Sequence, residues 1–100
     1  GTASWILLGQ PNSMDLSFGS TAHGAGRTMS RTKARRNYNE NDVKKSLNDK
    51  GIFIKALTRD GIVEETPQAY KDVDAVVNVS HNLGIATRVA KLVPIGVIKG

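Results

Sequence analysis

The glycine-rich segment from Gly19 to Gly26 constrains the fold of this chain more than any other stretch. Three glycines fall within these eight residues, and glycine adopts positive φ angles and lets the backbone approach a ligand closely. The sequence before the segment predicts a strand and the sequence after it favours a helix. Backbone N–H groups in front of a helix favour an anion, above all phosphate. The segment therefore predicts either a phosphate-binding loop or an ordinary turn.

Two strands are expected before this loop. Residues 3–8 are mostly apolar and predict a buried strand, and residues 9–13 predict a turn. Met14, Leu16 and Phe18 alternate with polar residues, which is the period-two pattern of a second strand. The short turn between the two predicted strands indicates a hairpin.

Helices are expected after the loop. The first covers residues 28–36, and the second begins at Asn39 or Asn41, whose side chains cap helices, and runs to about Lys50. Gly51 stands where a left-handed residue commonly ends a helix. These local patterns place the basic stretch that follows the glycines on a helix.

The second half of the chain also predicts strands and a helix separated by turns. Residues 52–57 and 95–98 predict strands, and Asp60-Gly61 predicts a turn. A further helix opens at Asp72 or Asp74 and carries an apolar face of Val73, Val76 and Val77, with Gly84 closing it. The expected class is α+β, with a mixed or antiparallel sheet and two or three helices.

The charge of the chain is positive, with 14 Lys and Arg against 9 Asp and Glu. Half of the positions from 27 to 36 are basic: Arg27, Arg31, Lys33, Arg35 and Arg36. Such a strip can contact phosphates of a nucleic acid or can be a solvated helix face. Arg27 and Arg31 share a face if the helix begins early enough. Aromatic residues make up only 5% of the chain, which argues against stacking of several bases.

The absence of cysteine excludes disulfides and cysteine-type zinc sites. The two histidines, His23 and His81, are too few to form a metal site alone. His81 falls near the edge of an apolar helix face, where we expect a structural role. No apolar run approaches the roughly 20 residues that span a bilayer, and no signal peptide is visible. We therefore expect no membrane association.

His23 lies at the centre of the glycine-rich loop. A neutral imidazole has a ring nitrogen with a free lone pair, which can attack a phosphoryl centre and hold it covalently. A histidine between glycines is also common in simple turns. The residues alone leave both interpretations open.

Several ordered motifs resemble the RtcB family of tRNA-splicing RNA ligases. They are Phe18-Gly19-Ser20, His23-Gly24-Ala25-Gly26-Arg27, Met29-Ser30-Arg31, Lys33-Ala34, Ala69-Tyr70-Lys71-Asp72-Val73-Asp74, Gly84-Ile85-Ala86 and the tail from Pro94 to Gly100. The resemblance covers essentially the whole chain and implies the single C-terminal segment, residues 1–100, of a longer ligase with a larger α/β fold. One departure is Ala22, where the family often has cysteine before the motif histidine.

The resemblance implies an enzyme that joins RNA ends bearing a 2′,3′-cyclic phosphate or 3′-phosphate to a 5′-hydroxyl end. The family uses GTP and Mn²⁺ in tRNA splicing and RNA repair. Its motif histidine, matched by His23, takes GMP from GTP as a phosphoramidate. The GMP passes to the RNA 3′-phosphate and is then displaced by the 5′-hydroxyl.

The same resemblance assigns residues to the nucleotide. It implies that Ser4, His23, Gly24, Ala25, Gly26 and Lys99 bind GTP or GMP, and that Arg27, Arg31 and Tyr70 contact nucleotide or RNA. From the residues alone, Lys99 is a solvated tail residue and Tyr70 a half-buried packing residue. The family's metal ligands lie upstream, so no metal ligand is expected within this chain.

The implied partners are RNA (tRNA halves or other cleaved RNA), GTP and the upstream part of the same ligase, in the cytoplasm. We expect the 100 residues alone to be inactive. A non-catalytic basic RNA-binding module is the alternative from another class, and a folded segment with no binding of its own is the third.

Overall fold

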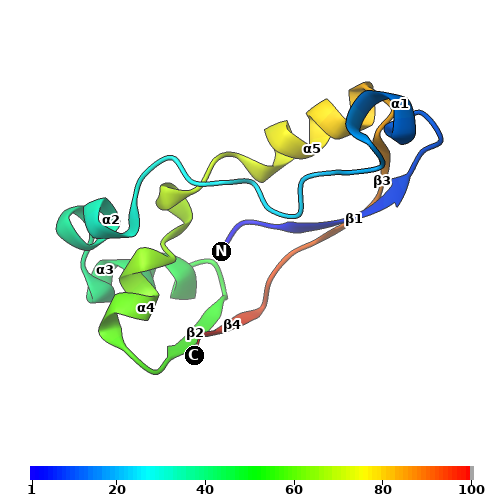
Figure 1. The fold of residues 1–100 in the computed structure, drawn as a ribbon. Helices are drawn as coiled ribbons and strands as arrows, with labels where there is room; N and C mark the ends of the chain where they lie inside the picture. Colours follow the sequence, from blue (N-terminus) through cyan, green and yellow to red (C-terminus); the bar gives the residue numbers. More distant parts are fainter. Residues whose placement is uncertain (100) are drawn as a thin grey trace. The chain divides into compact units, whose positions relative to one another are not determined.

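The computed structural model describes residues 1–99, and Gly100, the last residue of the matching tail, lies outside the described residues. The α+β class is confirmed (Figure 1). The chain divides into two compact units. Unit 1 holds residues 1–2, residues 27–70 and the described residues from Pro94 on, and unit 2 holds residues 3–26 and 71–93.

Unit 1 begins with two helices that carry their own capping residues. Helix α2 covers Arg31–Asn37, and the Ser30 hydroxyl accepts a hydrogen bond from the N–H of Lys33. Helix α3 covers Glu40–Asn48, and the Asn39 side chain accepts one from the N–H of Asp42. Side chains at this position satisfy N–H groups that a helix cannot pair internally. The predicted cap at Asn39 is confirmed, and so is the left-handed Gly51, whose φ is 72°.

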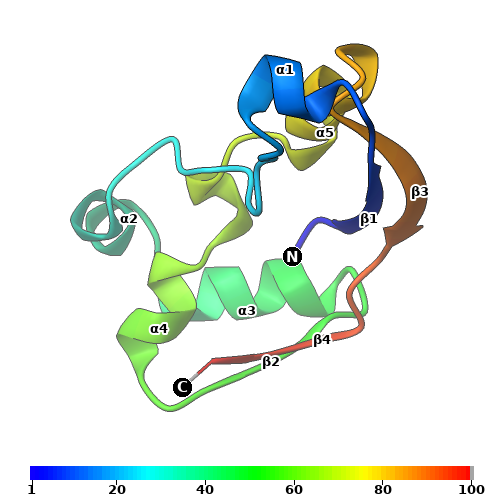
Figure 2. The ribbon, with the colours of Figure 1, turned by 45° about the vertical axis from the view of Figure 1, so that its right-hand side comes forward.

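A two-stranded parallel sheet completes unit 1. Strand β2, Phe53–Ala56, pairs with strand β4, Gly96–Lys99. Helix α4, Arg59–Glu64, and the short 3₁₀ helix η1, Pro67–Ala69, follow β2. Figure 2 shows α3 lying across the β2–β4 pair. The buried residues of α3 form the core of the unit with the residue before β2 and one from α4: Val43, Leu47, Ile52 and Ile62.

Unit 2 consists of an antiparallel strand pair and two helices. Strand β1, Ser4–Gly9, pairs with strand β3, Ala86–Leu92, with a register shift between Ile6 and Leu7. Helix α5, Val73–Asn82, packs on β3, and the Asp72 carboxylate accepts hydrogen bonds from its first N–H groups. Gly84 follows the helix with a φ of 72°. The predicted helix, its cap at Asp72 and its closing glycine are therefore confirmed.

The predicted second strand and hairpin are wrong. Residues Ser13–Ser17 form helix α1, which ends at Phe18 in the left-handed region with a φ of 54°. The Gly19 N–H, at a φ of 71°, donates to the carbonyl of Ser13 and closes the helix. A period-two pattern predicts a strand only where one face is buried, and the side chains of Met14, Leu16 and Phe18 are all exposed.

Two other expectations fail at helix ends. The helix after the glycines begins at Arg31 and not at residue 28, because Ser30 caps it and Arg27 forms an extended bridge with Tyr70. Arg27 and Arg31 therefore do not share a helix face. Asp60-Gly61 lies inside α4 and not in a turn, because the Thr58 hydroxyl accepts a hydrogen bond from the Gly61 N–H and starts that helix. With α1 and α4, the described residues contain five α-helices.

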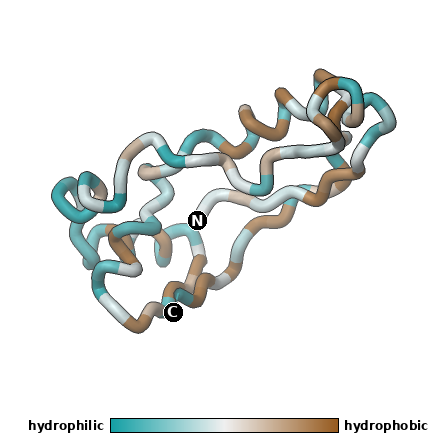
Figure 3. Tube along the Cα trace, in the orientation of Figure 1, coloured by the Kyte–Doolittle hydropathy of each residue, from teal (hydrophilic) through white to brown (hydrophobic). Residues whose placement is uncertain are grey.

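The strand over residues 3–8 is present, but it is not buried. Ile6 is 50% exposed and Leu8 is 61% exposed, whereas Trp5 and Leu7 are half-buried, because no element of residues 1–99 covers the face that carries Ile6 and Leu8. Figure 3 shows apolar stretches in unit 2, while α2 in unit 1 is largely hydrophilic. None of the helices within residues 1–99 is long and apolar enough to cross a membrane.

Candidate functional site

Hydrogen bonds hold the loop that carries His23 at both of its ends. At its start, the hydroxyl of Thr21 lies 3.3 Å from the hydroxyl of Ser80 on α5. At its end, the carbonyl of Gly26 accepts a hydrogen bond of 2.9 Å from the N–H of Lys71. Between these points the backbone bends at His23 and Gly24, and the His23 side chain is exposed. The loop therefore leaves the imidazole accessible to solvent.

The two glycines after His23 serve different geometric purposes. Gly26 has a φ of 78°, which side chains with a Cβ rarely adopt. Gly24 has no positive φ, and a Cβ built there meets nothing within 4 Å among the described residues. The space over Gly24 is thus open, as close approach of a ligand to the backbone requires. Ala25 between them is half-buried.

Ser4 lies in unit 2 at the first residue of β1, opposite Leu92 in the sheet register, and it is exposed. His81 lies in α5, where its Nδ1 accepts a hydrogen bond of 3.1 Å from the N–H of Arg88. This contact links the helix to β3. The structural role expected for His81 agrees with that link.

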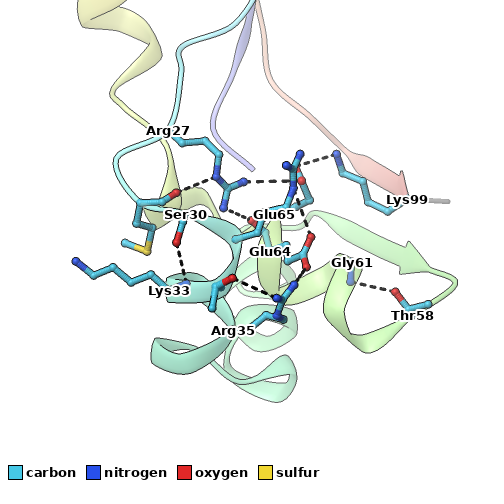
Figure 4. A network of polar contacts seen from close by, with 12 residues as sticks. Arg27, Ser30, Lys33, Arg35, Thr58, Gly61, Glu64, Glu65 and Lys99 are labelled. Atoms are coloured by element: carbon cyan, nitrogen blue, oxygen red, sulfur yellow. Dashed lines mark hydrogen bonds and ion pairs between the residues drawn. The ribbon is translucent and has the colours of Figure 1, made fainter.

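Arg27 is the centre of a polar network in unit 1. Its guanidinium donates to the carbonyl of Met29 at 3.0 Å, to the carbonyl of Glu64 at 2.7 Å and to the hydroxyl of Tyr70 at 3.1 Å. It also lies 4.8 Å from the centroid of the Tyr70 ring and 3.9 Å from a carboxylate oxygen of Glu65. Figure 4 shows Arg27 and Lys99 approaching the pair Glu64 and Glu65. Arg27 is therefore half-buried and paired, unlike a free surface cation.

Glu65 joins the remaining members of this network. Its Oε2 accepts hydrogen bonds from the Tyr70 hydroxyl at 2.5 Å and from Lys99 Nζ at 3.2 Å. Burial, the largest single influence, raises the pKa of Glu65, but the hydrogen bonds from Tyr70 and Lys99 lower it. The charges of Lys99 and Arg27 act in the same direction, so the pKa lies below its ordinary value. Glu65 is accordingly held as a carboxylate.

The pKa of Tyr70 is shifted in the opposite direction, above its ordinary value. Burial raises its pKa, and the hydrogen bond and negative charge of Glu65 raise it further, against the opposing influence of Arg27. The phenol therefore remains a proton donor to Glu65. The structure thus brings together three residues that the sequence singled out separately: Arg27, Tyr70 and Lys99.

Glu64 pairs with two basic residues of α2. Its carboxylate pairs with Arg31 at 3.5 Å and with Arg35, which also lies within hydrogen-bond distance. The side chain of Arg31 remains 64% exposed, so it can still reach a phosphate. The basic strip is therefore partly neutralised from within unit 1.

The sequence analysis missed both glutamates. Neither Glu64 nor Glu65 lies in a motif or on a helix face that the sequence singles out, and the basic stretch of residues 27–36 lies well upstream of both. The signal that could have found them is the excess of positive charge in residues 27–36, because half-buried arginines need carboxylate partners.

The residues needed for a metal site are not gathered here. Within residues 1–99 no group of three or more His, Asp and Glu side chains is placed to hold a metal ion. A hollow of about 500 Å³ is lined by residues 39–42 and Arg59, and one of about 400 Å³ by Lys44, Asn48 and residues 51–54. Neither lining includes a residue predicted to bind nucleotide.

Relatives match this chain over its whole length. It is 54% identical over 100 residues to the "tRNA-splicing ligase RtcB" of Nanoarchaeum equitans and 48% identical to that of Methanococcus maripaludis. It is also 48% identical to the "RNA-splicing ligase RtcB" of Mycobacterium bovis. The matches cover 100% of this chain but 21%, 21% and 23% of the three relatives. The chain thus spans about a fifth of their length.

The model of one protein family agrees with these relatives. The family described as "tRNA-splicing ligase RtcB" matches residues 1–100. The motifs that carry the resemblance, including the exposed loop of His23, fall within this match. On these grounds, the chain belongs to the tRNA-splicing ligase RtcB family.

Proposed function

We propose that this chain is the C-terminal segment of a GTP-dependent RNA ligase and carries its nucleotide-accepting histidine, His23. The observation that carries the proposal is the family match over residues 1–100, with His23 exposed in a glycine-rich bend. The ligase would join RNA 2′,3′-cyclic phosphate or 3′-phosphate ends to 5′-hydroxyl ends, as in tRNA splicing.

The chemistry requires an exposed nucleophile. A neutral ring nitrogen of His23 attacks the α-phosphorus of GTP, an N–P bond forms and pyrophosphate leaves. The RNA 3′-phosphate then accepts GMP from the histidine, and attack by the 5′-hydroxyl releases GMP. Exposure of His23 and the open space over Gly24 support this role, since both the nucleotide and the RNA end must reach the imidazole.

The other candidate residues would bind rather than react. Gly24, Ala25 and Gly26 offer backbone groups to the guanylate, and Ser4 offers a hydroxyl. Lys99 and Tyr70 contact the nucleotide, and Arg27 and Arg31 offer charge-assisted hydrogen bonds to phosphates of nucleotide or RNA. The exposure of Arg31 supports its part in this assignment.

Manganese, when bound, would neutralise charge on the triphosphate and on the leaving pyrophosphate. Residues 1–99 do not by themselves fit such a metal, because their metal-binding side chains are not grouped. We therefore propose that the upstream part of the longer ligase holds the metal. We also propose a cytoplasmic location for the whole ligase. Residues 1–100 alone should join no RNA ends, and ligation by the isolated chain would refute this.

The test uses the full-length ligase with GTP labelled at its α-phosphate, together with manganese. We expect an acid-labile protein label that is lost in His23→Ala and kept in His81→Ala, the matched histidine that serves a structural contact. An unlabelled wild-type protein that still binds RNA in a salt-dependent manner would contradict the proposal and favour a non-catalytic RNA-binding module. A label that persists in His23→Ala would contradict the choice of residue.

A further inference from the structure

Tyr70 and Lys99 share an acceptor in the Glu65 carboxylate, since both donate hydrogen bonds to its atom Oε2. We propose that Glu65 is a positioning residue of the ligase, which holds Lys99 and Tyr70 in the arrangement that binds the guanine nucleotide. This inference rests on the proposed function, because it takes the nucleotide contacts of Lys99 and Tyr70 from there.

The three residues lie where three different elements end. Glu65 directly follows α4, Tyr70 directly follows η1 and Lys99 is the last residue of β4. The backbone of Lys99 is fixed, since it pairs with Ala56 in the sheet and its carbonyl accepts a hydrogen bond from the N–H of Leu57. Its long side chain has no such restraint from the backbone. The ion pair with Glu65 supplies the missing restraint and directs the ammonium group.

The hydrogen bonds around Tyr70 run in one direction. Arg27 donates to the Tyr70 oxygen, and the Tyr70 hydroxyl donates to Glu65. A carboxylate can only accept, so Glu65 fixes the phenol as its donor and thereby fixes the ring. Arg27 lies on the other carboxylate oxygen, Oε1, which leaves Oε2 to Tyr70 and Lys99. Removing the charge of Glu65 would release Lys99 and loosen the ring while leaving their backbones in place.

The neighbouring Glu64 provides a matched control. It lies beside Glu65 in sequence, but its carboxylate pairs with Arg31 and Arg35 of α2 and not with Lys99 or Tyr70. Both glutamates are comparably half-buried, with side chains 18% and 22% exposed. If negative charge in this part of unit 1 is all that matters, neutralising Glu64 or Glu65 should have the same effect on nucleotide binding. If positioning of Lys99 and Tyr70 matters, only the change at Glu65 should weaken it.

The experiment measures single-turnover guanylylation of the full-length ligase at increasing GTP concentration. For Glu65→Gln we expect the half-saturating GTP concentration to rise about tenfold, the scale of one charge-assisted hydrogen bond. The maximal rate and the melting temperature should stay close to wild type, as should all three values in Glu64→Gln. Glu65→Asp, which keeps the charge on a shorter side chain, should fall between wild type and Glu65→Gln.

A double-mutant cycle tests whether Glu65 acts through Lys99. In a Lys99→Met background the effect of Glu65→Gln should largely disappear, because interacting residues are not additive. Additive effects, an unchanged half-saturating concentration, or a loss of rate that parallels a loss of thermal stability would each overturn the positioning role. If wild-type protein is guanylylated in those cases, the proposed function stands and only this inference fails. A wild-type protein that takes no label would overturn both.

Discussion

The loop from Thr21 to Gly26 in unit 2 and the network around Glu65 in unit 1 present candidate residues by different physical means. The loop exposes His23 through backbone geometry, with a positive φ at Gly26 and hydrogen bonds at its two ends. The network places Lys99 and Tyr70 through charge, with Glu65 as the shared acceptor. The loop should therefore be sensitive to an added Cβ, and the network to a removed charge or to acid.

The largest effect is expected from Arg27→Ala in the full-length protein. Arg27 makes three hydrogen bonds and an ion pair while its side chain is only 20% exposed. Its loss removes the donor to the Glu64 carbonyl and the Tyr70 hydroxyl, and the positive charge beside the Glu65 carboxylate. The free energy of unfolding should fall by about 2–4 kcal/mol. Thermal denaturation measures this effect.

Arg36→Ala is the control for that measurement, because Arg36 is exposed at the end of α2. Its stability should change by less than about 0.5 kcal/mol. Equal melting temperatures for the two variants would show that the network does not hold unit 1 together.

A smaller effect is expected from Gly26→Ala, which tests the loop. The added Cβ would lie 3.9 Å from the Lys71 side chain, an ordinary contact, so the cost comes from the φ of 78°. A left-handed alanine costs about 1–2 kcal/mol. Gly24→Ala, which adds its Cβ to open space, should leave the melting temperature unchanged. A Gly26→Ala protein as stable as wild type would contradict the account of the loop.

The smallest expected effect is a change in stability with pH, which arises from Glu65 in the network and not from the loop. The pKa of Glu65 is lowered in the folded protein from an ordinary value of 4.5, so its charge stabilises the fold above that pH. This contribution is lost as the pH falls below about 4.5 through the folded pKa, and we expect under about 1 kcal/mol because the site is partly solvated. Denaturation midpoints of wild type and Glu65→Gln should converge at low pH. A constant difference at every pH would contradict the prediction.

The sequence correctly predicted those features of the fold that depend on the type of a single residue. Asn39 and Asp72 cap helices, and Gly51 and Gly84 follow helices in the left-handed region, because capping and positive φ depend on the residue itself. The glycine-rich loop around His23 was identified on the same basis. The His23 side chain is exposed there, and its role as the nucleophile, which the resemblance implies, stays a prediction.

The features that failed depend on distant partners. Strand β1 pairs with β3, almost the length of the chain away, and no periodicity in residues 3–8 indicates this partner. The alternation of Met14 and Leu16 with polar residues predicted a strand, but it carries no information on the hydrogen bond from Gly19 that closes helix α1. The role of Glu65 also requires Lys99, which is 34 residues away. Side-chain networks of this kind become visible only once the fold brings their members together.

Peptide mapping of the guanylylated full-length ligase by mass spectrometry shows directly which residue carries the nucleotide. We predict a single GMP adduct, on His23, formed from GTP and discharged when RNA ends are supplied. An adduct on another residue, such as His81 or Lys99, that is discharged by RNA while His23 remains unmodified would contradict it.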